Sequence, residues 1–535
     1  MCYYNNIGGI IIMKKIEILD STLRDGAQGE SVSFSVSDKL RIADALDKLG
    51  VDYIEAGNPF SNPKDADFFE RAAKCRFSHA RLAAFGSTVR KDTLPEDDEG
   101  LRALLAAGTE YTVIFGKAWD LQVDCILGTT LEENLKMIRE SVAYLCSKGR
   151  KVFFDAEHFF DGYKSDPDYA VEVIKTAEKA GASCIVLCDT NGGCFPEEIS
   201  KTVKEVRKTI KVQTGIHCHN DTGCAVANTL AAVRSGACHI QGTLVGLGER
   251  CGNAALSTVI PDLQLKLGYD MITPKQLASL SRTALFISEV TNLRVPASMP
   301  YVGKAAFAHK GGMHVDGVAK DPRTYEHIDP AAVGNRRSFL VSEVSGRSSV
   351  LPRLRQIDST LTKSSEETKA VTDRLKELER QGFQFEAAAA SFELMVLKEL
   401  GRFKPHFEID HYRIISSMDD IGGNIYTEKA NALVKVRVGD RSEITADEGE
   451  GPVNALDKAL RKALEVFYPE LKKMHLIDFK VRVIASNDST AAITRVLIES
   501  TDGENTWTTV GASRDIINAS VLALTDSLEY MLKDK

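Results

Sequence analysis

The chain has 535 residues, of which 43% are hydrophobic and 27% charged, so it is too long for one ordinary core and too balanced for a disordered, fibrous or coiled-coil protein. Lys and Arg number 67 against 75 Asp and Glu, and the resulting net charge of −8 leaves no overall basic field for a nucleic acid. Apolar runs extend over only a few residues, far short of the ~20 that span a bilayer, so we expect no transmembrane segment.

The first residues and the cysteines indicate where the protein works. Residues 1–12 lack the basic region and the small-residue cleavage site of a secretory signal, and we expect Met13, which is followed directly by Lys14 and a strand-like run, to be the working start. The eleven cysteines all lie between Cys2 and Cys251, and such an odd, one-sided set is unlike a disulfide framework. We therefore expect free thiols, a reducing compartment and a cytoplasmic protein.

Eight short β-rich apolar runs alternate with amphipathic helical stretches over residues 14–280. The runs begin near residues 16, 52, 81, 111, 151, 184, 211 and 239. Helical patterns between them include residues 38–49, 131–148 and 197–209. Eight βα units over this length predict an α/β fold with a closed (β/α)8 TIM barrel, although the count alone also allows an open, doubly wound sheet.

The pattern changes after the predicted barrel. Residues 281–402 are predicted to form a linker with helical and irregular subdomains, in which 295–347 is too polar for a core and 364–400 is strongly helical. From residue 403 strand patterns return, and they predict a C-terminal α+β domain over 403–535. Its strands are expected over 411–417, 430–439, 478–486 and 491–500, and its helices over 454–467 and 513–532.

A candidate metal site combines residues from two of the predicted strands. His217 and His219 lie in the seventh run, where period-two alternation points both imidazoles to one face and Cys218 to the other. Asp25 follows the first run, and the carboxyl ends of barrel strands face the active site. Two His and one carboxylate form a facial triad for a divalent cation such as Mg²⁺, Mn²⁺ or Zn²⁺. A His pair alone also occurs among ordinary surface residues.

A glycine-rich turn, Gly246–Asn253, follows the eighth run. Its GxGxxxG spacing differs from the dinucleotide fingerprint, so we predict no nucleotide cofactor here. At the same barrel end Asn253 offers a carbonyl oxygen to the metal, and Glu249 offers a carboxylate that would orient a ligating His. The alternative is a tight loop without a role in binding.

Three motifs in this order, LDSTLRDGAQ, HCHND and GLGERCGN, resemble those of the metal-dependent Claisen-condensing acyltransferases, which include the isopropylmalate, homocitrate and citramalate synthases. The resemblance covers nearly the whole chain. The segments DAEHFFDGYKSDP, LCDTNGG and HKGGMHVDGVAKDPRTYEHIDP look most like the citramalate branch, which joins acetyl-CoA to pyruvate. The resemblance thus implies an enzyme with a divalent metal, acetyl-CoA as co-substrate and a product on the route to isoleucine.

The resemblance also implies roles for the residues that match these motifs. Asp25, His217 and His219 would bind the metal, with Asn253 as a weaker fourth ligand. Arg24 would lie beside the keto oxygen of the 2-oxo acid, where a permanent cation stabilises the alkoxide that forms as the keto carbon becomes tetrahedral.

Three more residues would contact the substrates. Thr190 would bind the carboxylate of the 2-oxo acid, Gln28 would neighbour the same substrate, and Glu157 would be the catalytic acid that also acts as a base with His314. Thr190 is otherwise a strand-end cap, and Glu157 an exposed loop carboxylate. The His158 that follows Glu157, where many relatives carry Asp, and the Asn-Gly-Gly after Thr190 depart from the commonest pattern and leave the identity of the 2-oxo acid open.

The segment after the barrel matches residues that relatives contribute from the partner subunit. His314, Asp316 and Tyr325 would reach over the barrel mouth of the other copy, an arrangement that requires a homodimer. His309 and Lys310 would contact the phosphates of CoA.

The last domain resembles the regulatory domain of this family. The resemblance implies that it pairs with its copy and binds isoleucine as feedback effector, and the turn Asp447–Pro452 before a helix offers backbone N–H groups to a carboxylate. The alternative is dimerisation alone. For the whole chain the rival functions are an isopropylmalate synthase, a lyase or aldolase on the same barrel, and a non-catalytic amino-acid-sensing protein.

Overall fold

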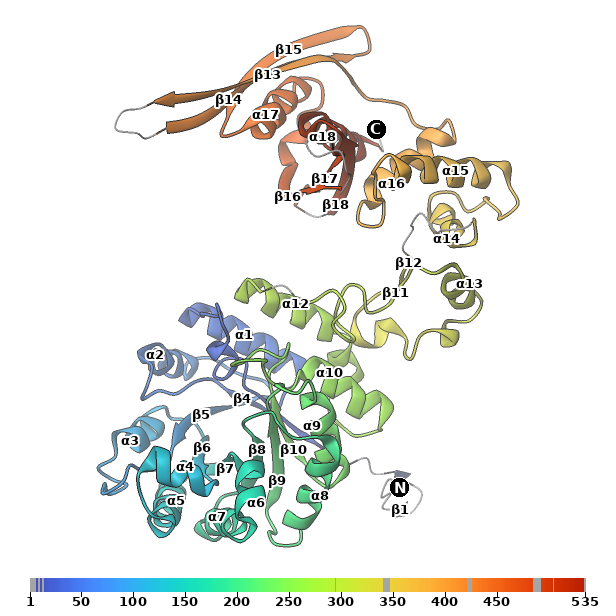
Figure 1. The fold of residues 1–535 in the computed structure, drawn as a ribbon. Coiled ribbons are helices and arrows are strands. Elements are labelled where there is room, and N and C mark those ends of the chain that lie inside the picture. The colour runs from blue at the N-terminus through green and yellow to red at the C-terminus, as the bar shows by residue number, and fades with distance from the viewer. Residues whose placement is uncertain are drawn as a thin grey trace. The chain divides into compact units, whose positions relative to one another are not determined.

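The computed structural model describes residues 6–7, 10–11, 14–293, 295–339, 347–420, 426–484, 492–503 and 505–533. They fall into two compact units, Met1–Phe307 with His327–Arg337, and Ala308–Glu326 with Ser338–Lys535 (Figure 1). The expected start at Met13 lies outside the described residues, and the domain boundaries drawn from the sequence stay predictions. The first unit opens with a short antiparallel pair, β1 (Asn6–Ile7) and β2 (Ile10–Ile11).

Eight parallel strands of the first unit close into a barrel in the order β10-β3-β4-β5-β6-β7-β8-β9. The pairing of His239 with Glu17 and of Gly242 with Asp20 closes the ring. The prediction of a TIM barrel is confirmed, and each strand overlaps one of the eight predicted runs. The strands are β3 (Glu17–Asp20), β4 (Tyr53–Glu55), β5 (Arg81–Ser87), β6 (Tyr111–Lys117), β7 (Lys151–Glu157), β8 (Cys184–Asp189), β9 (Gln213–Cys218) and β10 (His239–Gly242).

Helices between the strands surround the barrel (Figure 1). Helix α1 shows why they form where they do: Ser35 and Asp38 make a reciprocal capping box at its start, and Gly50 ends it with a positive φ of 93°. The three helices predicted before the eighth strand are present as α1, α5 and α8. The helices are α1 (Val36–Leu49), α2 (Pro63–Ala72), α3 (Glu99–Ala106), α4 (Asp120–Gln122), α5 (Leu131–Ser147), α6 (Phe159–Ser165), α7 (Pro167–Ala180), α8 (Pro196–Val206), α9 (Ala225–Arg234), α10 (Leu256–Pro261), α11 (Pro274–Leu277) and α12 (Leu280–Thr291).

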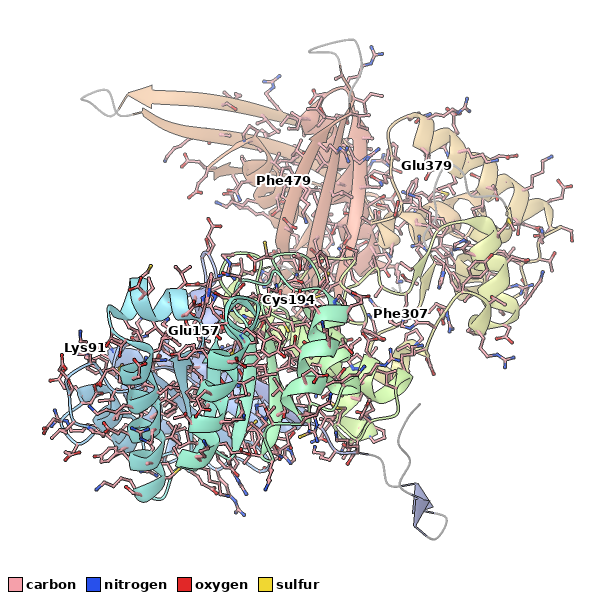
Figure 2. The ribbon with its side chains drawn as sticks, turned by 60° about the horizontal axis from the view of Figure 1, so that its bottom comes forward. Lys91, Glu157, Cys194, Phe307, Glu379 and Phe479 are labelled. Carbon is pink, nitrogen blue, oxygen red and sulfur yellow. The ribbon has the colours of Figure 1, made fainter. Side chains whose placement is uncertain are left out.

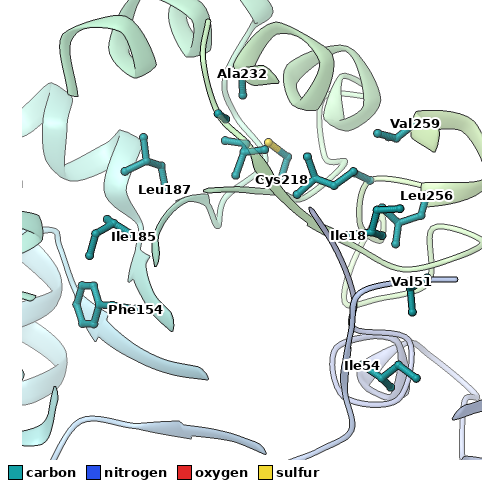
Figure 3. Close-up of a cluster of buried hydrophobic side chains, with 14 of the residues drawn as sticks. Ile18, Val51, Ile54, Phe154, Ile185, Leu187, Cys218, Ala232, Leu256 and Val259 are labelled. Carbon is teal, nitrogen blue, oxygen red and sulfur yellow. The ribbon is translucent and has the colours of Figure 1, made fainter. Parts of the chain in front are cut away.

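Side-chain alternation along the strands divides the core of the first unit into two layers. Outward residues such as Phe154, Ile185 and Leu187 are buried against the helices (Figure 3). Their neighbours Phe153 and Val186 point inward and pack in the barrel interior. The strand period of two therefore decides which side chains reach the axis, where the site lies.

The second unit is α+β, as predicted. Two antiparallel sheets, β13-β14-β15 and β16-β17-β18, share one core with α17 and α18, and α14 to α16 form a smaller helical core. The elements are β11 (Ala308–His309), α13 (Gly312–Lys320), β12 (Ser338–Phe339), α14 (Arg347–Ile357), α15 (Glu366–Arg380), α16 (Ala389–Glu399), β13 (Glu408–Asp420), β14 (Tyr426–Val438), β15 (Arg441–Gly449), α17 (Pro452–Leu464), β16 (His475–Val483), β17 (Thr494–Thr501), β18 (Thr506–Ser513) and α18 (Ile516–Leu532).

Three sequence expectations for the later part of the chain were wrong. The helical run over 364–400 is broken, because Gly382, with a φ of 99°, follows the end of α15. Strands β15 and β18 were not predicted, and the first residues of the expected turn Asp447–Pro452 belong to β15. Residues 295–347 also reach a core, since Tyr301 and Phe307 are buried against the barrel. In the described part of the chain, no helix is both long and apolar enough to cross a bilayer.

Candidate active site

Asp25, His217 and His219 meet inside the carboxyl end of the barrel, as predicted from their strands. Their side chains come from the turn after β3 and from the end of β9, and the three residues are 2%, 5% and 6% exposed. The Nε2 atoms of His217 and His219 lie 3.5 and 3.8 Å from Oδ2 of Asp25. One ligand atom from each residue fits within 4.8 Å of the other two, so the triad has the geometry of a metal centre.

The electrostatics of the triad favour the protonation states that bind metals. Burial and the neighbouring His219 lower the pKa of His217 to about 3, and burial also lowers the pKa of His219, so both imidazoles are neutral. Burial disfavours the charged form of Asp25, but the guanidinium of Arg24, whose Nη1 lies 3.1 Å from Oδ2, holds the pKa of this carboxyl below its usual value. The site therefore presents a carboxylate and two imidazole lone pairs.

Asn253 adds an oxygen to the same site. Its backbone bridges to His219, and its amide nitrogen donates to the Leu247 carbonyl at 3.0 Å. Its Oδ1 and Oδ1 of Asp25 are buried without a hydrogen-bond partner among the described residues, and such oxygens are costly unless a cation or water binds them. Gly248, with a φ of 151°, leaves the room for Asn253, since a Cβ there would lie 2.2 Å from Nδ2. Two nitrogens and two oxygens without a thiolate fit Mg²⁺, Mn²⁺ or Zn²⁺.

Arg24 lies beside this donor set in a fixed orientation. Its Nε donates to Oε2 of Glu55 at 2.7 Å, and its guanidinium carbon lies 3.9 Å from the ring centroid of Phe85. Glu55 is fully buried and also accepts from the Ser21 hydroxyl at 2.5 Å. The cation is thus held by a carboxylate and a ring, with its free donors near the triad.

Glu157 and Thr190 lie at the carboxyl ends of neighbouring strands, as expected. Glu157 ends β7 (Figure 2) and forms an ion pair with Lys117 at the end of β6. Thr190 follows β8, and its Oγ1 accepts from the His158 backbone N–H at 2.9 Å, which leaves the hydroxyl hydrogen available to a substrate carboxylate. His158 has a positive φ of 56° and directly precedes helix α6.

A cavity of about 250 Å³ borders the site on the side of β4 and β5. Arg24 and Phe85 form the wall nearest the triad, and the exposed Gln28 forms another part of the lining. Asn58 and Lys64 add polar and cationic groups. Pyruvate has six heavy atoms, so the cavity holds more than that acceptor.

The predicted residues of the second unit form a cluster of their own. The rings of His314 and Tyr325 stack with centroids 4.1 Å apart, and both side chains are exposed. Asp316, on the same helix as His314, pairs with Lys320 at 2.6 Å. The two residues expected at the CoA phosphates are instead paired with carboxylates, His309 with Glu326 at 3.0 Å and Lys310 with Glu386 at 2.8 Å.

Sequence reasoning missed several groups that hold the site together. Glu249, expected to orient a ligating His, has a half-exposed side chain near Arg250, and the residue that contacts His217 is Gln241 of β10, at 3.1 Å. Lys117 and Glu55 were missed as well. Each is a polar residue at or near the carboxyl end of an apolar strand, and that position was the available signal.

Three family descriptions match the chain in succession. Residues 15–285 match the HMGL-like family, 301–382 the homocitrate synthase post-HMGL domain, and 386–532 the LeuA allosteric (dimerisation) domain. The chain is 50% identical to an (R)-citramalate synthase of Aquifex aeolicus and 48% identical to one of Geobacter sulfurreducens, over 98% and 97% of this chain and 99% and 98% of those proteins. Its identity to a 2-isopropylmalate synthase of Pyrococcus furiosus is 33%, over 96% of this chain and 99% of that protein.

A closed barrel with a buried Asp-His-His centre at its mouth defines a metal-dependent TIM-barrel enzyme. The family matches and the full-length identities go further: the chain belongs to the HMGL-like family and, within it, to the (R)-citramalate synthases. Members of this group are acyltransferases.

Proposed function

We propose that the protein condenses acetyl-CoA with pyruvate and water to give (R)-citramalate and CoA, as the first step of a route to isoleucine. The observation that carries the proposal is the triad of Asp25, His217 and His219 at the barrel mouth with Arg24 beside it. The identity of 48–50% to (R)-citramalate synthases along the whole chain supports pyruvate as the acceptor.

The metal ligands in this proposal are Asp25, His217, His219 and, more weakly, Asn253. A divalent cation held there supplies Lewis acidity that polarises the carbonyl of the 2-oxo acid. The two unpartnered oxygens, Oδ1 of Asp25 and Oδ1 of Asn253, support this assignment. Thr190 donates its hydroxyl hydrogen to the substrate carboxylate and orients the keto carbon.

Glu157 takes a proton from the methyl group of acetyl-CoA. The electron pair of that C–H bond forms the new carbon–carbon bond to C2 of pyruvate, and the keto oxygen becomes an alkoxide. Arg24 stabilises the negative charge on this oxygen, because its guanidinium cannot lose its proton and is fixed by Glu55. The proton taken up by Glu157 returns to the alkoxide, which becomes the hydroxyl group of the product. Water then hydrolyses the thioester, CoA leaves, and the condensation becomes irreversible in practice.

The cavity beside Arg24 is proposed to receive the acetyl end of acetyl-CoA, next to the acceptor, while the rest of the molecule lies outside it. Its lining supports this, because Phe85 offers an apolar wall to the acyl group while Asn58 and Lys64 offer polar contacts to the adjoining part of the molecule. Gln28 lies between the two substrates in this arrangement.

A homodimer completes the proposed site. His314, Asp316 and Tyr325 of the partner subunit act at the barrel mouth, where His314 assists Glu157 in the proton transfer. The stacking of His314 on Tyr325 supports a common role, since it presents the two exposed side chains as one unit. The match of residues 386–532 to an allosteric dimerisation domain supports the dimer and a feedback effector, which we propose is isoleucine. The free cysteines among the described residues support a cytoplasmic location.

The release of free CoA from acetyl-CoA in the presence of single 2-oxo acids tests the proposal. We expect the largest kcat/KM with pyruvate and a dependence on added divalent metal. A larger kcat/KM with 2-oxoisovalerate makes the protein an isopropylmalate synthase and leaves the condensation chemistry intact. No CoA release with any 2-oxo acid refutes the proposed enzyme.

A further inference from the structure

We infer that Gln241 is a positioning residue, which fixes the tautomer of His217 so that Nε2 is presented to the metal, and that Asp155 sets the orientation of Gln241. The inference rests on the metal centre of the proposed function. It concerns two residues, on β10 and β7, that are no part of the assigned site.

The hydrogen bonds run in one line through the barrel interior. His217 Nδ1 lies 3.1 Å from Oε1 of Gln241, and Nε2 of Gln241 donates to Oδ1 of Asp155 at 3.0 Å. Gln241 is fully buried and Asp155 is 4% exposed, so water does not replace these partners. Gln241 thus joins His217 on one side to Asp155 on the other.

Donor and acceptor roles then follow from the orientation of the Gln241 amide. Its NH₂ group faces Asp155, which offers an accepting oxygen whether or not the carboxyl is protonated, and its oxygen faces His217. An amide oxygen only accepts, so Nδ1 of His217 carries the hydrogen. The lone pair of the neutral ring is therefore on Nε2, the nitrogen that lies 3.5 Å from Asp25.

The other imidazole of the centre lacks this device. Nδ1 of His219 is buried and has no hydrogen-bond partner among the described residues. The two ligands thus differ in how they are held: His217 by a line of side chains, His219 by its strand end and the backbone bridge to Asn253. This difference supplies an internal control.

The line also connects the metal centre to the strand of the proposed base. Asp155 and Glu157 are two residues apart on β7, so both side chains point to the barrel interior. Shortening Gln241 would release His217 and leave polar groups of His217 and Asp155 unsatisfied at once.

The test measures metal binding by the full-length protein, with Mn²⁺ as the probe. We expect Gln241→Met to weaken Mn²⁺ binding about 10- to 100-fold, the usual effect of losing the partner of a ligating His. Gln241→Glu keeps an acceptor for Nδ1–H but replaces the donor to Asp155 by a second carboxyl, so it should bind Mn²⁺ more tightly than Gln241→Met and more weakly than the wild type. Gln264→Met, which removes a side chain hydrogen-bonded to Ile272 elsewhere in the same unit, is the matched control and should bind Mn²⁺ like the wild type.

A second measurement keeps the inference testable if Gln241→Met does not fold. In metal-free, ¹⁵N-histidine-labelled wild-type protein, the ring nitrogen shifts of His217, assigned by comparison with His217→Ala, should show the tautomer with hydrogen on Nδ1. The opposite tautomer overturns the inference, as does a Gln241→Met protein that binds Mn²⁺ as tightly as Gln264→Met. A wild type that binds no Mn²⁺ refutes the proposed metal centre together with the inference.

Discussion

The two ends of the barrel are built from the same eight strands, but their inward side chains do different things. At the carboxyl ends, Asp25 and His217 are buried and direct ligand atoms at one another. At the amino ends, Tyr53, Tyr111 and Phe153 pack together with ring centroids 4.8 to 5.3 Å apart. The carboxyl end therefore presents polar atoms that can bind ligands, and the amino end is packed with aromatic rings.

Substitutions at the carboxyl end of the barrel should affect chemistry, and substitutions at the amino end should affect stability. At the amino end His239 is fully buried. Its ring centroid lies 5.0 Å from that of Phe153, and its Nδ1 lies 3.8 Å from Oε2 of Glu17. The carboxyl end instead opens onto a cavity lined by Arg24. Activity and folding should therefore be separable along the barrel axis.

The largest effect is expected from the carboxyl end. His217→Ala or Asp25→Asn removes a metal ligand, and the loss of about 4 kcal/mol of Lewis-acid stabilisation should lower kcat/KM about a thousandfold. The barrel should stay folded, because neither side chain belongs to its hydrophobic layers. Condensation rates, metal content and thermal unfolding measure the three quantities. Near-normal turnover by His217→Ala in metal-depleted buffer would show that the triad is misassigned.

Phe153→Ala tests the amino end. Removing a ring from the packed interior should lower the free energy of unfolding by about 3–5 kcal/mol. Below its unfolding transition, the variant should keep the metal affinity and kcat of the wild type per folded molecule. Denaturant unfolding measures the free energy of unfolding, and Mn²⁺ titration measures the metal affinity. A stable Phe153→Ala protein with lost metal binding would mean that the two ends are not separable.

The ratio of kcat/KM for two 2-oxo acids tests which acceptor the carboxyl end of the barrel prefers. 2-Oxoisovalerate carries two methyl groups more than pyruvate, and each extra methyl that fits poorly costs about 1–3 kcal/mol. Together the two methyl groups cost at least about 2 kcal/mol, so we expect kcat/KM to be about 30-fold or more higher with pyruvate. Parallel kinetics with both acids and saturating acetyl-CoA give the ratio. A preference for the branched acid would overturn the pyruvate assignment only.

The last effect concerns the proposed effector site of the C-terminal domain. Isoleucine should raise the apparent KM or lower kcat of the full-length enzyme about 5- to 150-fold, the range of ordinary allosteric coupling. His217→Ala should bind isoleucine as tightly as the wild type, because the proposed effector site belongs to residues 386–532 and not to the barrel. Inhibition kinetics and calorimetry measure both. Enzyme that ignores isoleucine, leucine and valine at millimolar concentration would leave the C-terminal domain with dimerisation alone.

Much of the barrel and the triad follows from local sequence pattern. Alternation in HCHND predicts that His217 and His219 point inward and Cys218 outward, and the structure has this arrangement. The supporting residues could not be predicted, because their partners are distant in the chain: Gln241 is 24 residues from His217, Arg24 is 31 from Glu55, and Lys117 is 40 from Glu157. Pattern identifies a strand and its faces, but only closure of the barrel decides which polar side chains meet.

The second unit shows a different limit. Strand β15 carries mostly polar residues and is half exposed along its length, so its alternation lacks the apolar signal that marks a buried strand. Helix α15 ends at Arg380 and α16 begins at Ala389, and Gly382 between them has a positive φ of 99°. A single Gly is also tolerated inside a helix, so the sequence alone does not mark this end.

The most direct test of the central claim follows both products of the reaction with one preparation of full-length enzyme. With ¹³C-labelled acetyl-CoA and pyruvate, we predict that chelated protein forms neither free CoA nor product, and that added Mg²⁺ or Mn²⁺ restores equal amounts of free CoA and labelled (R)-citramalate. Labelled citramalate formed at full rate in chelator, or metal-dependent CoA release without labelled citramalate, would contradict the account.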